Sequence, residues 1–418
     1  MSLIARHLRP RLERALERSR VVMLHGARQC GKTTLAQLVA EESGGAYISL
    51  DDEVHRQAVL DDPIDYLSHF EKPLVIDEVQ LGGDRVVRAI KQLVDNDPTL
   101  GRFLLTGSTN FLTVPNISES LAGRVRILRL GPLSQAELSG VRPTAITGWF
   151  EGEPGPTPAS PPTKAQYLAL VTQGGYPEAI SADPEDRYDW FDDYIETVAQ
   201  RDITALADIR KAASLPLLLQ WTAALTSHQI NVSDAARDLK VSPPTIVSYL
   251  EWLQTVFLIH ELPAWSRSLW PKAGRRPKFH ITDSGLAASL VGANADALAS
   301  PTHPATGPLL ETFAFNEVAR QLEALPTRCT LSHYRDRQGR EIDLVLEARN
   351  GRVVAVEVKA TTSPALKHLD NLRWLRDKLD SANPGTFQAG VLLHTGAHAA
   401  TLGNRLHMRP ISTLWTPA

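Results

Sequence analysis

Cysteine is scarce in this chain: only Cys30 and Cys329 occur among 418 residues, which excludes a disulfide framework. The sequence also lacks any apolar run of about 18 residues, so we expect no membrane-spanning helix and no membrane partner. Residues 1–20 are rich in arginine but have no apolar stretch of the signal-peptide kind, and we interpret them as an amphipathic helix. These absences predict a cytoplasmic protein.

Neither sign of charge is in large excess, because 44 Lys and Arg residues face 47 Asp and Glu residues. The formal net charge of −3 excludes a uniformly basic nucleic-acid binder, so local basic patches need separate inspection. Hydrophobic residues make up 43% of the chain, which is ordinary for a globular protein. The length predicts roughly two or three domains.

Residues 26–33 form a complete phosphate-binding loop, with the pattern Gly-x-x-x-x-Gly-Lys-Thr. An apolar run before the loop predicts a strand and residues 34–40 predict a helix, which is the context this motif requires. Main-chain N–H groups and the helix N-terminus bind phosphate oxygens, Lys32 neutralises the β- and γ-phosphates, and the Thr33 hydroxyl can ligate Mg²⁺. The predicted cofactors are therefore ATP and Mg²⁺. The residues expected to contact the nucleotide are Gly26, Ala27, Arg28, Gln29, Cys30, Gly31, Lys32, Thr33 and Thr34.

A second buried strand, residues 74–76, runs directly into two carboxylates. We expect Asp77 to belong to the Mg²⁺ shell and Glu78 to polarise the attacking water as general base. A third strand, residues 102–106, is followed by polar residues, of which Ser108 and Asn110 are candidates for contact with the γ-phosphate or the water. A capped turn before a helix explains the same polar residues, and this alternative stays open.

These motifs resemble those of the archaeal-type AAA+ ATPases of prokaryotes, in which a C-terminal domain of uncharacterised function is usual. The resemblance implies an additional-strand ATPase core with a catalytic glutamate. It also suggests Arg124 as an arginine finger for a neighbour's γ-phosphate, and hence a nucleotide-dependent homo-oligomer such as a hexamer. The alternative for Arg124 is a surface arginine before an edge strand. The segments that carry the resemblance are residues 23–37, 76–80, 105–108, 121–125 and 174–178, with the region to about 359.

Strand and helix patterns alternate through the first third of the chain, which predicts an α/β domain with a parallel sheet. A Pro-rich stretch, residues 151–163, predicts a linker or exposed loop, and a second joint falls at residues 295–308. The expected organisation is an AAA+ ATPase domain at 1–140, a linker at 141–163, a helical and winged-helix domain at 164–294 and a restriction-endonuclease-like α/β domain at 295–418.

Residues 215–285 are predicted to form a winged helix-turn-helix. We expect helices at 216–227, 232–239 and 245–254, and strands at 256–259 and 278–281 that pair as the wing. The exposed face of the third helix is poor in base-reading side chains, so a scaffold that joins domains or binds protein is an equal alternative to a DNA reader. The basic residues bracketed by the wing, which suit phosphate contacts, are Arg267, Lys272, Arg275, Arg276 and Lys278.

The last feature is a pair of strands, residues 341–346 and 353–359. Alternation places Glu357 and Lys359 on one face, and an antiparallel partner brings Asp343 beside them. A helix that opens at residue 309 can add Glu311. This set resembles the restriction-endonuclease-like fold, which implies that Glu311, Asp343 and Glu357 hold one or two Mg²⁺ ions and that Lys359 helps to activate water or to stabilise the oxyanion.

Two functions follow from these patterns. The first is ATP-driven action on DNA, in which the C-terminal domain cuts or grips nucleic acid. The second is a nucleotide-dependent signalling or scaffolding switch whose C-terminal domains bind protein and are not catalytic. The first requires Mg²⁺-dependent cleavage or salt-sensitive DNA binding, and the second requires neither.

Overall fold

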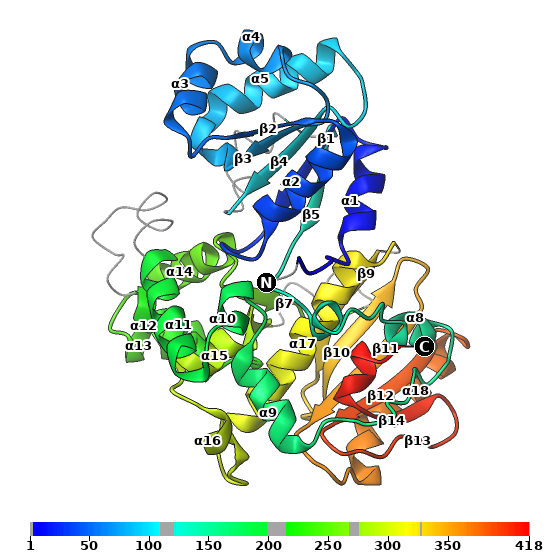
Figure 1. Cartoon of the computed structure of the whole chain (residues 1–418). Coiled ribbons are helices and arrows are strands. Elements are labelled where there is room, and N and C mark those ends of the chain that lie inside the picture. The colour runs from blue at the N-terminus through cyan, green and yellow to red at the C-terminus, as the bar shows by residue number, and fades with distance from the viewer. Residues whose placement is uncertain are drawn as a thin grey trace. The chain divides into compact units, whose positions relative to one another are not determined.

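The computed structural model describes residues 3–108, 121, 123–198, 215–266, 276–326 and 328–417. The chain forms two compact units, which are shown in Figure 1 and taken one at a time below. The first unit comprises Ala5–Pro132 with Thr255–Leu258, and the second comprises Leu133–Gln254 and Ile259–Ala418 with Met1–Ile4. Asn110, Arg267, Lys272 and Arg275 lie outside the described residues. No helix in the described part of the chain is both long and apolar enough to cross a bilayer.

The first unit contains a five-stranded parallel sheet, which confirms the predicted α/β class. Its strand order is β2-β3-β4-β1-β5. Because β1, β4 and β3 are neighbours and run parallel, their carboxyl ends lie side by side at the same edge of the sheet. The strands are β1 (Val21–His25), β2 (Ala46–Ser49), β3 (Leu74–Asp77), β4 (Phe103–Gly107) and β5 (Val125–Arg129).

Helices cover both faces of this sheet (Figure 1). Alternate residues of β1 point to opposite faces, so that Val22 packs with α1 and α2 while Met23 packs with α3, α4 and α5. The predicted amphipathic N-terminal helix is present as α1, whose apolar side is buried against the sheet. The helices are α1 (Arg9–Leu16), α2 (Lys32–Ser43), α3 (Glu53–Asp61), α4 (Pro63–Ser68), η1 (Val79–Gly82) and α5 (Gly83–Asn96).

The second unit begins with helices and a small antiparallel sheet of order β6-β8-β7. The strand expected at 256–259 begins only at Ile259, because Phe257 has a φ of 60° and the chain turns there instead of extending. The helices are α7 (Gln135–Leu138), α8 (Ala145–Phe150), α9 (Lys164–Gln173), α10 (Pro177–Ser181), α11 (Pro184–Val198), α12 (Leu215–Ala224), α13 (Val232–Asp238), α14 (Pro243–Thr255), α15 (Ser284–Leu290) and α16 (Ala295–Ala299), and the strands are β6 (His228–Gln229), β7 (Ile259–Leu262) and β8 (Lys278–Ile281).

A six-stranded mixed sheet of order β13-β14-β12-β11-β10-β9 forms the rest of the second unit. The predicted pair of strands is confirmed: β10 and β11 are antiparallel, with Leu344 opposite Val356. The stretch expected to be a linker differs from the prediction, since α8 within it is ordered and buries Trp149 completely. The elements are α17 (Thr306–Ala324), β9 (Cys329–Arg335), β10 (Glu341–Ala348), β11 (Val353–Lys359), η6 (Leu366–Leu369), α18 (Asp370–Ala382), β12 (Phe387–His394), β13 (Ala400–Thr401), β14 (Leu406–Pro410) and η7 (Ile411–Trp415).

A buried carboxylate on α17 anchors the start of α7. Both oxygens of Glu317 accept the main-chain N–H of Gln135 at 3.0 Å, and Arg320 lies 3.6 Å away. Glu317 is 1% exposed. Burial raises the pKa of this carboxyl to about 7 against the partial opposition of Arg320, and the nearby charges of Glu137 and Asp283 add to the rise.

The raised pKa predicts a pH-dependent stability. Between the ordinary value of 4.5 and about 7, the folded protein keeps a proton on Glu317 that the unfolded chain has released. Stability therefore falls as pH rises through this window, by up to about 3 kcal/mol. We expect Glu317→Gln to flatten this loss in calorimetric melts, whereas Glu185→Gln, an exposed control on α11, should leave it unchanged. An unchanged profile in Glu317→Gln would contradict the assignment.

Candidate functional site

The phosphate-binding loop leaves β1 and enters α2 through a glycine-dependent turn. A Cβ on Gly26 would lie 1.9 Å from the carbonyl oxygen of Leu130, so only glycine fits there. Gly31 has a φ of 93° and caps α2, which begins at Lys32. Cys30 is fully buried and its Sγ donates to the Leu130 carbonyl at 3.3 Å.

Two cations stabilise the main chain of this loop. The Nζ of Lys32 donates to the Ala27 carbonyl at 2.8 Å, and Lys32 itself is only 5% exposed. Arg6, which no sequence pattern had singled out, donates to the carbonyl of Cys30 at 2.6 Å and to that of Gly131 at 2.7 Å. The remaining predicted loop residues lie nearer the surface, with Arg28 half-buried and Gln29 and Thr34 exposed.

Three hydroxyl groups surround the carboxylate of Asp77 at the end of β3. Thr33 Oγ1 donates to Asp77 Oδ2 at 2.8 Å and Tyr47 OH donates to the same oxygen at 3.0 Å, while Thr106 Oγ1 donates to Oδ1. Burial, followed by the charge of Asp77, raises the pKa of Tyr47 to about 12, so its phenol keeps its proton. The adjacent Thr33 hydroxyl and Asp77 carboxylate are the oxygen donors that Mg²⁺ prefers, so these residues fit the ion.

Glu78 sits directly after Asp77 in an unusual backbone conformation. Its φ of 51° and ψ of 45° place a non-glycine residue in the left-handed region, which is uncommon and costs free energy. Ser108 Oγ lies 3.3 Å from Glu78 Oε2, and the amide of Gln80 donates to both Glu78 and Ser108. The structure thus places Ser108 and Gln80 beside Glu78, whereas contact of Ser108 with the γ-phosphate or the water stays a prediction.

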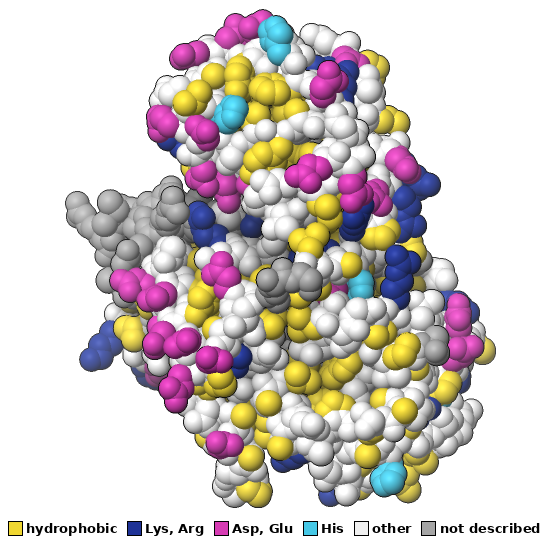
Figure 2. Space-filling model, viewed as in Figure 1, with side chains coloured by type: hydrophobic (Ala, Val, Ile, Leu, Met, Phe, Trp, Pro, Cys, Tyr) yellow, Lys and Arg dark blue, Asp and Glu magenta, His cyan; other side chains and the backbone are white. Residues whose placement is uncertain are grey.

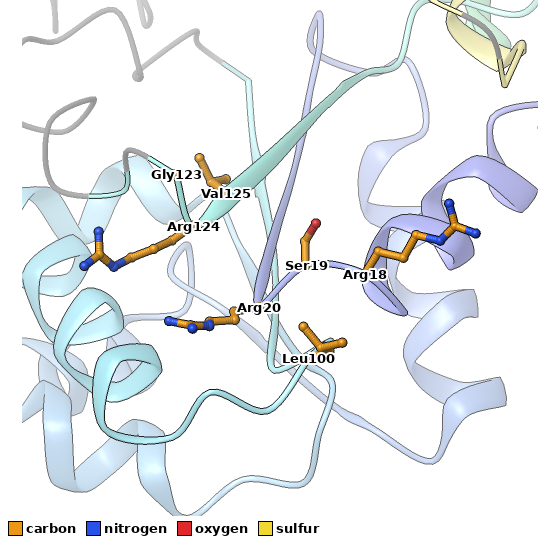
Figure 3. Close-up of a pocket in the computed structure, with 7 residues that line it drawn as sticks. All are labelled: Arg18, Ser19, Arg20, Leu100, Gly123, Arg124 and Val125. Atoms are coloured by element: carbon orange, nitrogen blue, oxygen red, sulfur yellow. The ribbon is translucent and has the colours of Figure 1, made fainter.

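Arg124 lies at the other edge of the sheet. It precedes β5, and the phosphate loop follows β1, which runs parallel to β5 with Val21 beside Val125. The Arg124 guanidinium is paired with Asp95, at 2.5 Å and 3.1 Å, at the side of a pocket of about 440 Å³. In Figure 3, Arg20 and Arg124 both point toward α5, whereas Arg18 points the other way. A strand of five residues spans about 13 Å, so Arg124 lies well away from the loop of its own chain.

The C-terminal residues predicted to share a site do converge in the second unit. Lys359 Nζ lies 2.9 Å from Glu357 Oε2 and 3.8 Å from Asp343 Oδ2, and Asp343 also accepts the main-chain N–H of Val358 at 2.8 Å. Asp343 and Glu357 therefore face the same side of the sheet. Glu311, on α17, is linked to the cluster by an ion pair with a lysine that was predicted to lie in the wing of the winged helix.

That residue is Lys278, the first residue of β8. Its Nζ lies 2.8 Å from Glu311 Oε1, 2.7 Å from Glu341 Oε1 and 3.6 Å from Asp343 Oδ1. Burial alone would lower the pKa of Lys278, but these three carboxylates raise it above its usual value, so the side chain is an ammonium. Burial, followed by the charge of Asp343, raises the pKa of Glu311 to about 8 and that of Glu357 well above its usual value.

Comparison with family models divides the chain into three matched regions. Residues 18–139 match the model described as AAA domain. Residues 164–297 match a Domain of unknown function (DUF8612), and residues 306–414 match a Domain of unknown function (DUF4143). The first region is thus an AAA domain, and it contains the phosphate loop, Asp77 and Glu78.

Two curated relatives are similar over most of the chain. Uncharacterized protein Rv2008c of Mycobacterium tuberculosis and Uncharacterized protein Mb2031c of Mycobacterium bovis are each 31% identical over 357 residues, which is 85% of this chain and 74% of theirs. Among solved structures, the Walker-type ATPase PABY2304 of Pyrococcus abyssi is 16% identical, with 69% of this chain and 96% of that chain covered and a TM-score of 0.43. The Thermotoga maritima RuvB Holliday junction branch migration motor is 19% identical, with coverage of 61% and 89% and a TM-score of 0.28.

Removal of one hydroxyl tests whether Asp77 needs its neighbours. Tyr47→Phe deletes one donor to Asp77 Oδ2, and a hydrogen bond to a charged group contributes about 1.5–3 kcal/mol. We expect a weaker hold on Mg²⁺, seen as a higher Mg²⁺ concentration for half-maximal ATP turnover. Tyr66→Phe is the matched control, because the Tyr66 hydroxyl contacts His55 on the neighbouring helix instead. Equal Mg²⁺ dependence in wild type and Tyr47→Phe would contradict this role.

Proposed function

The chain belongs to the same family as the two mycobacterial proteins, and from this premise we propose that it binds ATP with Mg²⁺ and hydrolyses the γ-phosphate bond. The observation that supports this most directly is the 2.8 Å hydrogen bond between Thr33 and Asp77. It joins the phosphate loop to the acidic end of β3, the two halves of a nucleotide site that lie far apart in the sequence.

Each residue of the site then has a defined task. The main-chain N–H groups of residues 26–33 and the ammonium of Lys32 hold the phosphates. Thr33 and Asp77 would hold Mg²⁺, which when bound neutralises phosphate charge. Glu78 accepts a proton from the attacking water, while Ser108 and Gln80 orient its carboxylate by hydrogen bonds. Asn110 remains a candidate contact for the γ-phosphate.

Arg124 can serve only a nucleotide held by a second copy of the chain. Its position at the amino-terminal end of β5 separates it from the loop at the carboxyl end of β1. A guanidinium from a neighbour would stabilise charge on the γ-phosphate during transfer. We therefore include a nucleotide-dependent homo-oligomer in the proposal, with Asp95 holding Arg124 ready at the surface.

We propose that ATP hydrolysis drives a conformational change and that the second unit transmits this change to a protein partner. Action on DNA is the second candidate, and the basic residues between β7 and β8, including Arg276, favour it. Figure 2 shows acidic side chains around the α3 and α4 end of the first unit. In these helices and at their start, Glu53, Asp62 and Asp65 are exposed, and such carboxylates would repel a phosphate backbone. Turnover that DNA stimulates in a salt-sensitive way would favour the second candidate over the first.

Substitutions at Lys32 and Glu78 test the division of labour. Lys32→Ala should weaken ATP binding, because it removes the charge that faces the phosphates. Glu78→Gln should bind ATP as well as wild type does but hydrolyse it about 10²- to 10⁴-fold more slowly, the usual contribution of a general base. Binding is measured with a fluorescent ATP analogue and turnover by phosphate release. A wild-type turnover rate in Glu78→Gln would reject Glu78 as the base.

Mixing two inactive variants tests the role of Arg124 in trans. Arg124→Ala should lose turnover with little loss of ATP affinity. Added Lys32→Ala protein should restore part of the activity, because an intact Arg124 then meets an intact phosphate loop. Arg88→Ala, an exposed arginine on α5 that is also paired with an aspartate, is the matched control and should stay active. Full activity of a strictly monomeric protein would contradict the proposal.

A further inference from the structure

The cluster of carboxylates in the second unit has no role in the proposed ATPase activity. Resemblance to the restriction-endonuclease-like fold implies one or two Mg²⁺ ions at Glu311, Asp343 and Glu357. Whether these residues fit a metal depends on what already lies among them. The described residues contain no group of three or more His, Cys, Asp or Glu side chains arranged to hold a metal ion.

A lysine lies where such a cation would be expected. The Nζ of Lys278 lies within 3.6 Å of Glu311, Glu341 and Asp343, which belong to α17 and β10. Lys278 is 2% exposed, so the ammonium is enclosed and does not extend into solvent. The three N–H groups of its ammonium can donate hydrogen bonds to the surrounding carboxylate oxygens, which are the atoms that a metal ion in this position would bind.

The other side of the cluster is satisfied by a second ammonium and by the main chain. Lys359 Nζ lies 2.9 Å from Glu357 Oε2, and the main-chain N–H of Val358 donates a hydrogen bond to Asp343 Oδ2. One atom is left over: Glu357 Oε1 is buried and has no hydrogen-bond partner. A buried polar atom without a partner costs free energy, and neither ammonium reaches this oxygen, because Lys359 contacts Oε2 of Glu357 and Lys278 contacts the other carboxylates.

Charge and space together oppose a divalent ion at this position. Mg²⁺ needs oxygen ligands at about 2.0–2.1 Å in octahedral geometry, and an ammonium already holds the oxygens of Glu311 and Glu341. A divalent ion next to Lys278 would also meet strong repulsion, since charges a few ångströms apart interact strongly where solvent is excluded. The residues present therefore do not fit a metal ion while Lys278 is in place.

We propose that the ammonium of Lys278 is the resident cation of this carboxylate cluster, which closes the site to Mg²⁺ and makes the C-terminal domain a metal-free relative of a nuclease fold. Lys278 belongs to the region that matches one family model, whereas Glu311, Glu341 and Asp343 belong to the region that matches the next. The lysine thus binds β8 to α17 and β10, and the cluster fastens the two regions into one compact unit. This inference is independent of ATP hydrolysis.

The test is to remove the ammonium and measure Mn²⁺ binding. All proteins carry Asp77→Asn, which removes a metal ligand of the phosphate site, and no nucleotide is added. Binding is followed by the loss of the electron paramagnetic resonance signal of free Mn²⁺. We expect the protein with Lys278 intact to bind no Mn²⁺ in the second unit. Lys278→Ala should gain one Mn²⁺ per chain, and adding Asp343→Asn should abolish that gain.

A thermal readout and a matched control accompany the titration. Mn²⁺ should raise the melting temperature of Lys278→Ala by at least about 2 °C, because a ligand that binds only the folded state stabilises it. Lys367→Ala, which removes an exposed lysine of the same unit, should behave like the protein with Lys278 intact in both assays.

The outcomes separate cleanly. Two results with Lys278 intact would overturn the proposal. One is Mn²⁺ binding that is lost when Asp343→Asn is added. The other is Mn²⁺-dependent DNA cleavage that is lost with the same substitution. A folded Lys278→Ala protein that binds no Mn²⁺ would overturn it too. If circular dichroism shows that Lys278→Ala does not fold, the titration with Lys278 intact decides alone, and absence of an Asp343-dependent site there supports the proposal.

Discussion

The carboxylate of Asp77 is the contact on which the nucleotide site depends. It lies at the end of β3 and receives hydroxyl groups from α2, β2 and β4, so four elements of the sheet and its helices meet at one charged group. A carboxylate that is only 4% exposed would be costly without such donors. With them, the charge is held in place, and the phosphate loop keeps a constant distance from Glu78.

The buried carboxylate of Asp77 and the carboxylate cluster around Asp343 are stabilised in different ways. Around Asp77 the donors that the described residues supply are neutral hydroxyls, which leave its negative charge available to a divalent cation. Around Asp343 the ammonium groups of Lys278 and Lys359 offset part of the charge of four carboxyl groups, those of Glu311, Glu341, Asp343 and Glu357. Under the proposal above, Lys278 takes the place that a metal ion would have in this cluster, whereas no lysine takes that place among the described neighbours of Asp77.

Sequence reasoning located the candidate residues that lie close together in the sequence. The loop at 26–33, the Asp77–Glu78 pair and the Glu357–Lys359 pair could be predicted because local pattern and alternation suffice to place them. Tyr47 and Thr106 were missed, since each reaches Asp77 from another strand and only the strand order brings them together. Arg6 was missed because it precedes α1 and is distant from the loop in the sequence. Gln80 was missed although it is only two residues from Glu78, because its contacts depend on the turn after β3. The sequence pattern predicted that Lys278 lies at the wing, where it would suit a phosphate contact. Its burial follows from the pairing of β8 with β7 and from the position of α17, which no local pattern encodes.

The sheet also explains why an oligomer belongs to the ATPase proposal. In a parallel sheet every strand ends at the same edge, so the phosphate loop, Asp77 and Ser108 all gather there, whereas whatever precedes a strand gathers at the other edge. Arg124 precedes β5 and is therefore held apart from its own nucleotide by the length of a strand. No side-chain rotation crosses that distance, because an extended arginine reaches only about half of it. If Arg124 contributes to hydrolysis at all, a second chain must supply the nucleotide, and the requirement for assembly follows from the topology.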